Sequence, residues 1–134
     1  MTSRGIPRQK NSSTHCTDEL IDRGEALARV DGDEELMASL VDIFLTEAAP
    51  MMEAIRSAVA NGDPGKLEKA AHRLKGSISI FGVGIVAQTA FELEQQGRNR
   101  DLTQTPETMV RLEQQMKNLQ LTLQKFQSEL QQSR

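Results

Sequence analysis

Aromatic residues are scarce in this chain of 134 residues, which has four Phe and neither Trp nor Tyr. Strands favour aromatic and β-branched side chains, and proteins that hold single-stranded nucleic acid stack bases on aromatic rings. The composition therefore argues against a β-sandwich and against a stacking platform for nucleic acid. The net charge of −3 also argues against a basic surface for DNA.

Cysteine is nearly absent, since Cys16 is the only one in the sequence. A single cysteine excludes an internal disulfide framework and fits a reducing compartment. No apolar run approaches the roughly 20 residues that a membrane helix needs, and no signal-peptide core follows Met1. We expect a cytoplasmic protein that does not contact a membrane.

The first 17 residues differ from the rest of the chain. They include Arg4, Arg8 and Lys10, no acidic residue and almost nothing apolar to bury. This composition predicts that residues 1–17 form a disordered arm or linker. Residues 18–134 are long enough for one domain with a modest core, but not for two.

Apolar residues recur three and four apart from Asp18 onward, which is the spacing of amphipathic helices. Start and stop signals divide this region into five helices. The first helix covers residues 18–30. The second is long, has Asp31 or Asp33 as its N-cap and ends at Asn61. The third runs from Pro64 to about residue 81, the fourth covers 85–98, and the fifth begins at Thr105. We expect an all-α fold, an antiparallel four-helix bundle with an additional short N-terminal helix.

Three of these helices carry apolar stripes that predict the core. The expected core residues are Leu36, Leu40, Phe44, Ala48, Met52, Ile55 and Val59 in the second helix, Leu67, Ala71, Leu74, Ile78 and Phe81 in the third, and Met109, Leu112, Met116, Leu119, Leu123, Phe126 and Leu130 in the fifth. Leu and Met stripes of this kind indicate core packing rather than a cofactor site. The fifth stripe is also a heptad seam that a second copy could use. Packing within one bundle needs the same residues, so we expect a monomer.

His72 lies on the polar face of the third helix, roughly 140° from its apolar stripe on a helical wheel. Lys75 and Gly76 follow it at three and four residues, and are its neighbours on the helix surface. A glycine inside a helix costs roughly 1 kcal/mol relative to alanine. We expect that Gly76 offsets this cost by leaving the imidazole open to a large anionic partner. As an exposed cation, Lys75 should contribute no more than about 1 kcal/mol to folding.

Other chemistries fit this sequence poorly. A metal site needs several converging ligands, and the other histidine, His15, lies beside Cys16 in the arm. Ser77 and Ser79 belong to the same helix as His72 and do not complete a nucleophile triad. The glycines of residues 82–84 lack the pattern of a phosphate-binding loop. We therefore expect no bound metal or cofactor, and no kinase activity in this chain alone.

The stretch AHRLKGSISIFG, residues 71–82, resembles the signature of histidine phosphotransfer domains. That signature is His-x-x-Lys-Gly-Ser followed by a glycine ten residues after the histidine, here Gly82. The similarity extends over roughly residues 20–127 and includes Pro50 before the motif and Glu94 in its Leu-Glu pair after it. It implies a four-helix bundle whose exposed histidine carries a phosphoryl group between receiver domains.

The resemblance also implies roles and partners. By position, His72 would be the phosphoacceptor, Lys75 the cation near the phosphoryl group, and Gly76 the gap that gives access to the imidazole. The partners would be response-regulator receiver domains and a hybrid sensor histidine kinase, with Mg²⁺ supplied by the receiver. Whether the chain stands alone or belongs to such a kinase stays open.

Three further polar residues on this helix are candidates of lesser weight. Glu68 and Lys69, one turn before His72, would orient the ring, contact a partner or simply face solvent, and Ser79 is a possible partner contact. Some family members have glutamine twenty-two residues after the histidine, where this chain has Glu94. A carboxylate pointing inward there would repel a phosphoryl group, so we assign no supporting role to Glu94 and leave its role open.

Two other functions remain as alternatives. A helical bundle could dock a partner without chemistry, with His72 incidental. A metal-dependent hydrolase on a bundle scaffold would need more ligands than the sequence offers. Acid-labile, alkali-stable label received from a phosphorylated receiver would distinguish a phosphoryl carrier from both.

Overall fold

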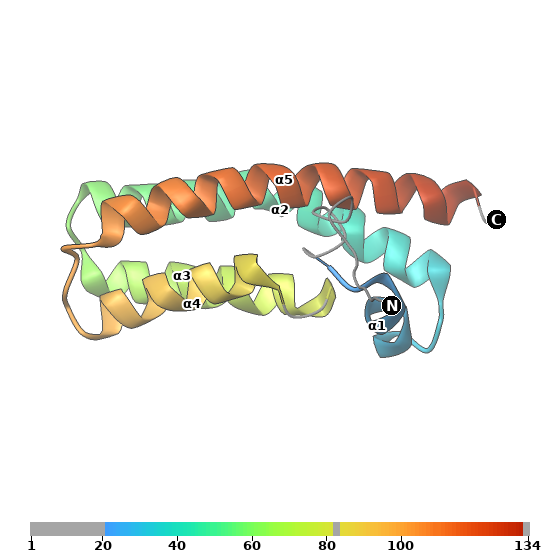
Figure 1. The fold of residues 1–134 in the computed structure, drawn as a ribbon, viewed down its shortest axis with the longest axis horizontal. Helices are drawn as coiled ribbons and strands as arrows, with labels where there is room; N and C mark the ends of the chain where they lie inside the picture. Colours follow the sequence, from blue (N-terminus) through green and yellow to red (C-terminus); the bar gives the residue numbers. More distant parts are fainter. Residues whose placement is uncertain (1–20, 82–83, 133–134) are drawn as a thin grey trace, which may run out of the picture.

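The computed structural model describes residues 21–81 and 84–132, which form a four-helix bundle (Figure 1). Its elements are α1 (Arg23–Arg29), α2 (Glu34–Ala60), α3 (Pro64–Ile78), the 3₁₀ turn η3 (Ser79–Phe81), α4 (Ile85–Arg98) and α5 (Thr105–Gln132). Consecutive long helices run in opposite directions, and each packs against two others in the order α2, α3, α4, α5 and back to α2. The predicted antiparallel bundle with a short leading helix is confirmed. The arm predicted over residues 1–17 lies outside the described residues. Of the break predicted over residues 82–84, the structure describes only Gly84, the residue before α4.

Aspartates begin three of the helices. The side chains of Asp22, Asp33 and Asp63 accept hydrogen bonds from backbone N–H groups in the first turns of α1, α2 and α3. Such a cap satisfies a backbone donor that has no partner within the helix, and it stabilises a helix by about 1 kcal/mol. Of the two caps considered for α2, the structure uses Asp33, whereas Asp31 lies in the preceding turn with φ of 57°. The predicted restart at Asp63 and Pro64 is confirmed.

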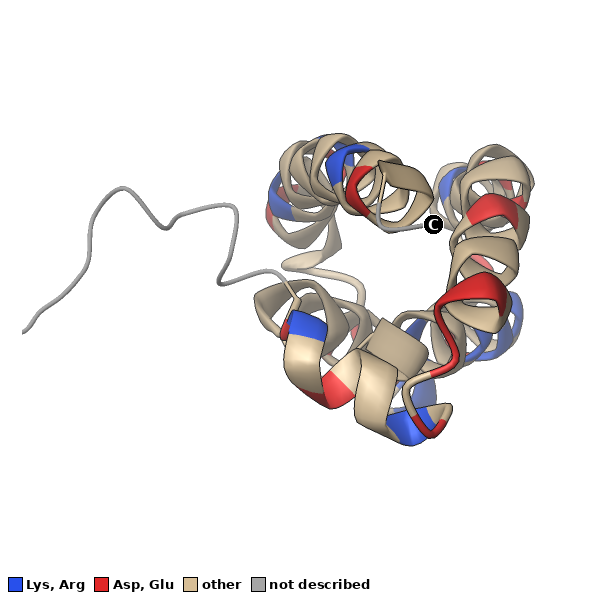
Figure 2. Cartoon of the chain, turned by 90° about the vertical axis from the view of Figure 1, so that its right-hand side faces the viewer, with Lys and Arg blue, Asp and Glu red and all other residues tan. Residues whose placement is uncertain are grey.

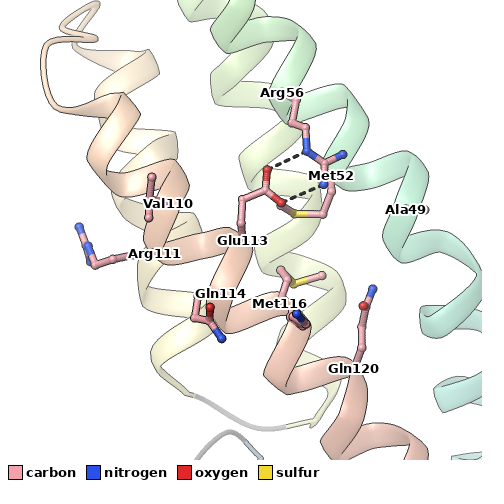
Figure 3. A pocket seen from close by; sticks show the side chains of 10 residues that line it. Ala49, Met52, Arg56, Val110, Arg111, Glu113, Gln114, Met116 and Gln120 are labelled. Carbon is pink, nitrogen blue, oxygen red and sulfur yellow. Dashed lines mark hydrogen bonds and ion pairs between the residues drawn. The ribbon is translucent and has the colours of Figure 1, made fainter.

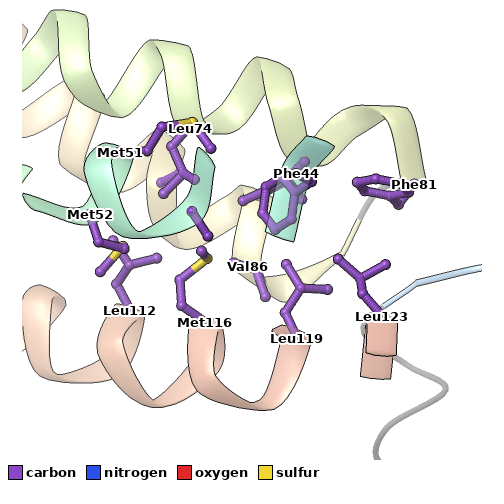
Figure 4. Close-up of a cluster of buried hydrophobic side chains, with 14 of the residues drawn as sticks. Phe44, Met51, Met52, Leu74, Phe81, Val86, Leu112, Met116, Leu119 and Leu123 are labelled. Carbon is purple, nitrogen blue, oxygen red and sulfur yellow. The ribbon is translucent and has the colours of Figure 1, made fainter. Parts of the chain in front are cut away.

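The core contains every residue predicted for it in α3 and α5, all of them buried. Figure 4 shows part of this cluster, in which the rings of Phe44 and Phe81 meet edge to face with centroids 5.6 Å apart. Figure 2 shows the bundle from one end, with the long helices α2, α3, α4 and α5 arranged around its centre. The polar face of α3 is left on the outside, where His72 is placed.

The stripe predicted for α2 is correct in its middle and wrong at its ends. Leu36 is 45% exposed, and Met37 is fully buried in its place. At the other end, Ala58 is buried and Val59 only partly so. The buried residues keep the three-and-four spacing along the whole of α2, from Met37 to Ala58. The predicted stripe is therefore one residue out of register at each end of the helix.

Helix α1 covers one end of the bundle. Its neighbouring residue Asp22 donates a backbone hydrogen bond of 3.4 Å to the carbonyl of Phe81, the last residue of η3. Arg23 reaches across to Glu129 of α5 at 3.0 Å and lies over the ring of Phe126. These contacts join the end of α3 to the end of α5. No helix among the described residues is long and apolar enough to span a membrane.

Candidate functional site

Helices α3 and α4 approach each other closely at Gly97. A Cβ atom added to Gly97 would lie 2.6 Å from the carbonyl oxygen of Pro64 and 2.7 Å from the backbone nitrogen of Glu68. Only glycine allows this approach, because backbone atoms of α3 occupy the space that any side chain would need. The sequence analysis missed Gly97, although a glycine inside the helical stretch FELEQQGRNR is a signal of such a contact.

The close approach brings Glu94 to His72. The side chain of His72 is 67% exposed, as predicted, and its Nδ1 lies 2.9 Å from Oε2 of Glu94. Glu94 itself is only 3% exposed, although it is a carboxylate. The sequence analysis assigned Glu94 no supporting role, and the structure places its carboxylate in contact with the His72 ring. Gly97 lies three residues after Glu94 and fixes the register in which α4 faces α3.

Two cations neutralise the buried carboxylate. Lys75 places its Nζ 2.7 Å from Oε1 of Glu94, and Arg98 places a guanidinium nitrogen 3.1 Å from Oε2. Arg98 also contacts Glu68 at 2.9 Å, so a continuous set of charges joins α3 and α4. Burial by itself would raise the pKa of Glu94, but hydrogen bonds and attraction from Lys75 and His72 outweigh it and hold the pKa below its usual range. Glu94 is therefore ionised at neutral pH.

The charge of Glu94 determines which nitrogen of His72 is free. An ionised carboxylate can only accept a hydrogen bond, so Nδ1 of His72 must donate it. A neutral imidazole that carries its proton on Nδ1 has its lone pair on Nε2. In its neutral form the exposed ring therefore has its lone pair on Nε2, the nitrogen that can act as a nucleophile.

The other predicted residues lie around His72 in two shallow hollows. Glu68, Lys69, His72, Glu94 and Arg98 line a hollow of about 450 Å³. Lys75, Gly76, Ser79, Ala87, Gln88 and Phe91 line a second of about 320 Å³. The Lys75 ammonium lies 4.9 Å from the centroid of the Phe91 ring. Both hollows are formed by α3 and α4, on the face that presents His72.

Gly76 opens onto free space. A Cβ atom added there would meet no heavy atom within 4 Å, in contrast to Gly97. The hydroxyl of Ser79 donates a hydrogen bond of 2.8 Å to the Gly76 carbonyl, so it is used within the helix end. Packing in the described structure therefore gives no reason for a glycine at position 76.

A larger hollow lies elsewhere, between α2 and α5 (Figure 3). Its volume is about 880 Å³, and Arg56 crosses it with two hydrogen bonds, of 2.7 and 2.9 Å, to Glu113. Hydrogen bonding to Arg56 holds the pKa of Glu113 below its usual range. Within the described segments, no group of three or more His, Cys, Asp or Glu side chains could hold a metal ion.

A large part of the chain matches the sequence model of a known protein family. The model described as "Hpt domain" matches residues 39–122, which include all of α3 and α4. The chain belongs to the Hpt domain family. The earlier resemblance to histidine phosphotransfer domains is thereby confirmed, and the matched residues of this Hpt domain include His72, Lys75, Gly76 and Glu94.

Two known proteins are similar to this Hpt domain. Sensor protein TorS of Escherichia coli (strain K12) is 39% identical over 69 residues, which span 52% of this chain and 7% of TorS. The crystal structure of histidine-containing phosphotransfer protein B (HptB) from Pseudomonas aeruginosa PAO1 superposes with a TM-score of 0.76 at 21% identity, covering 82% of this chain and 96% of that one. The HptB likeness concerns the fold, and the TorS likeness concerns a small part of a much longer protein.

Proposed function

We propose that this Hpt domain is a phosphoryl carrier of a two-component phosphorelay, with His72 as the phosphoacceptor. The observation that supports it best is the exposed imidazole whose Nδ1 is held by Glu94, because this leaves Nε2 as the nucleophile. Nε2 attacks the phosphorus of a receiver aspartyl phosphate, the P–O bond breaks, and the electron pair leaves with the aspartate carboxylate. The reverse reaction delivers the group to a second receiver.

The partners in this proposal are response-regulator receiver domains and a hybrid sensor histidine kinase. A receiver would bring Mg²⁺ and its acidic pocket, so that catalysis is shared positioning and charge stabilisation. Lys69, Lys75 and Arg98 place positive charge around His72 and suit an acidic partner. The α5 seam is buried within this chain's own bundle, which supports a monomer. We place the protein in the cytoplasm, where receiver domains act.

The test uses a panel of receiver domains phosphorylated with labelled acetyl phosphate in the presence of Mg²⁺. At least one should transfer label to this chain, and the label should be acid-labile and alkali-stable, as a phosphohistidine is. If every receiver carries label and none passes it on, the alternative of a docking module with an incidental His72 replaces this proposal. Binding of a receiver without transfer would point the same way.

We expect Gly76 variants to separate stability from activity. Gly76→Ala should stabilise the fold by roughly 0.5–1 kcal/mol, because alanine has the better helix propensity and restricts the unfolded chain. Gly76→Gln should also fold, since position 76 opens onto free space. Its side chain would stand one turn from His72 and obstruct the receiver, so transfer should slow markedly, and less so for alanine. Thermal melts and phosphotransfer rates measure the two effects.

Gly65→Gln is the matched control for these variants. Gly65 is exposed in the first turn of the same helix, about two turns before His72, and its added Cβ would meet only Asp63 at 3.7 Å. Transfer to this variant should match the wild type. If the Gly76→Gln protein were stable and its transfer rate unchanged, Gly76 would not be part of the surface that docks the receiver.

We expect Lys75→Ala to lower both stability and transfer. The sequence predicted almost no effect on stability, but Lys75 is only 30% exposed and neutralises the buried Glu94. Its loss should cost about 1–3 kcal/mol, because the carboxylate then lacks one of its partners. Phosphoryl transfer should slow as well, since a cation beside the phosphoryl group is lost. Chemical denaturation and transfer rates test this, with the exposed Lys66→Ala as control. Equal stability for the two variants would contradict it.

A further inference from the structure

The side of α3 that lies beside α2 is basic and hollowed. A hollow of about 420 Å³ lies there between the two helices, and we call it the α2–α3 groove. Three cations of α3 line it, Lys66, Lys69 and Arg73, and no acidic side chain among the described residues does. The rest of the lining is mainly small or buried apolar side chains, which are Met51, Ala54, Ala58 and Ala70.

The groove follows from the alanines on its two walls. Packed helices have their axes about 8–10 Å apart, and methyl side chains are too short to fill the space between them at the surface. Ala54 and Ala58 of α2 face Ala70 of α3 across this space. The three cations follow one another at three and four residues, so they lie within about 60° around α3 and extend along about 10 Å of it. A row of positive charge therefore runs beside an apolar floor.

These cations are poorly neutralised by the chain itself. Neither Lys66 nor Lys69 forms an ion pair with a carboxylate in the part of the chain that the structure describes. Arg73 lies 3.4 Å from Glu47, but the two side chains are 68% and 45% exposed, and exposed pairs of this kind contribute little. The positive charge of the groove is therefore available to a partner.

An acidic helix fits the groove better than other partners do. A purely apolar helix would bury the ammonium groups without a carboxylate, which is costly. A nucleic acid would have to approach a chain of net charge −3, and it would leave the apolar floor uncovered. Carboxylates spaced three and four residues apart on one side of a helix match the row of cations, and an apolar side chain beside them would contact the alanines.

We propose that the α2–α3 groove docks an acidic amphipathic helix of a partner protein. Its carboxylates pair with Lys66, Lys69 and Arg73, and an apolar side chain packs over Ala54 and Ala58. This docking requires no phosphoryl group and so goes beyond the proposed function. Lys69 also lines the hollow that contains His72, so the docked helix lies next to that face of α3 and holds the partner beside it.

A stapled helical peptide is the probe for this groove. It carries three glutamates spaced three and four residues apart, with leucine on the same side. A control peptide of the same composition has its glutamates distributed around the helix. Fluorescence anisotropy at low ionic strength should show that the full chain binds the first peptide about tenfold more tightly, because charge placement decides the fit. Added salt should weaken this binding, and amide NMR shifts should map it to α2 and α3.

Charge reversal in the groove should abolish most of this binding. Lys66→Glu and Lys69→Glu should each weaken it about tenfold, because an attraction becomes a repulsion. The control is Lys125→Glu, which makes the same change at an exposed position of α5 and should bind as the wild type does. Far-UV circular dichroism checks that each variant is folded.

Filling the groove tests its apolar floor without a change of charge. Ala54→Leu should weaken peptide binding about fivefold, because the larger side chain occupies the space of the docked helix. Ala49→Leu is the matched control, since Ala49 is exposed on the same helix and lies outside the groove.

Three results would overturn the proposal. They are equal binding of the two peptides, unchanged binding by Lys66→Glu and Lys69→Glu, and amide shifts confined to α4 or α5. A DNA duplex that bound the groove more tightly than the peptide would overturn it as well. None of these measurements involves a phosphoryl group, so they decide the docking role whether or not a receiver labels His72.

Discussion

His72→Gln should lose all phosphoryl label while keeping its fold. His72 supplies the nucleophilic nitrogen of the proposed reaction, and glutamine has none that can replace it. The side chain is 67% exposed, so little apolar contact is lost. The glutamine amide can also donate to the Glu94 carboxylate, which keeps that buried charge bonded. We expect complete loss of transfer from a receiver that labels the wild type, with helical circular dichroism unchanged.

His15→Gln is the control for this experiment. His15 is the other histidine of the chain and lies outside the described residues. This variant should be labelled as fully as the wild type. Label that persists on His72→Gln would contradict the carrier role of His72.

Gly97→Ala should strongly destabilise the fold. The added methyl group would lie within 3 Å of two backbone atoms of α3, at Pro64 and Glu68, which cannot rotate away as a side chain can. The helices must separate or shift, and overpacking of this kind costs about 1–3 kcal/mol. The melting temperature should fall by several degrees. The shift should also lengthen the contact between Glu94 and His72, and so slow transfer in the protein that remains folded.

Gly76→Ala provides a control with the same chemical change. Both glycines lie in helices, and alanine has the higher helix propensity at either position. The added methyl group meets nothing at position 76, so the two variants should change the melting temperature in opposite directions. If Gly97→Ala were as stable as Gly76→Ala, the close approach of α3 and α4 would not be a constraint.

Local sequence signals predicted most of the helical framework. Asp63 and Pro64 predicted the start of α3 because a cap and a fixed φ act within a single turn. The buried faces of α3 and α5 followed from the helical period, because one side of each helix faces the core along the whole predicted stripe. The same period placed His72 on the outside. The start of α2 was predicted wrongly, with Leu36 in place of Met37, because adjacent apolar residues both fit the helical period to within one position.

The sequence by itself determined the exposed histidine, its neighbours Lys75 and Gly76, and the bundle that carries them, because each depends on the period of one helix and on local start and stop signals. Only the tertiary structure decided what touches the imidazole. Glu94 is 22 residues from His72 and on another helix, so their contact depends on the register of α4 against α3. That register depends on Gly97, whose missing side chain lets the two backbones meet. A one-dimensional pattern contains no distance between helices, and so it could not show that the Glu94 carboxylate lies within hydrogen-bonding distance of the His72 ring.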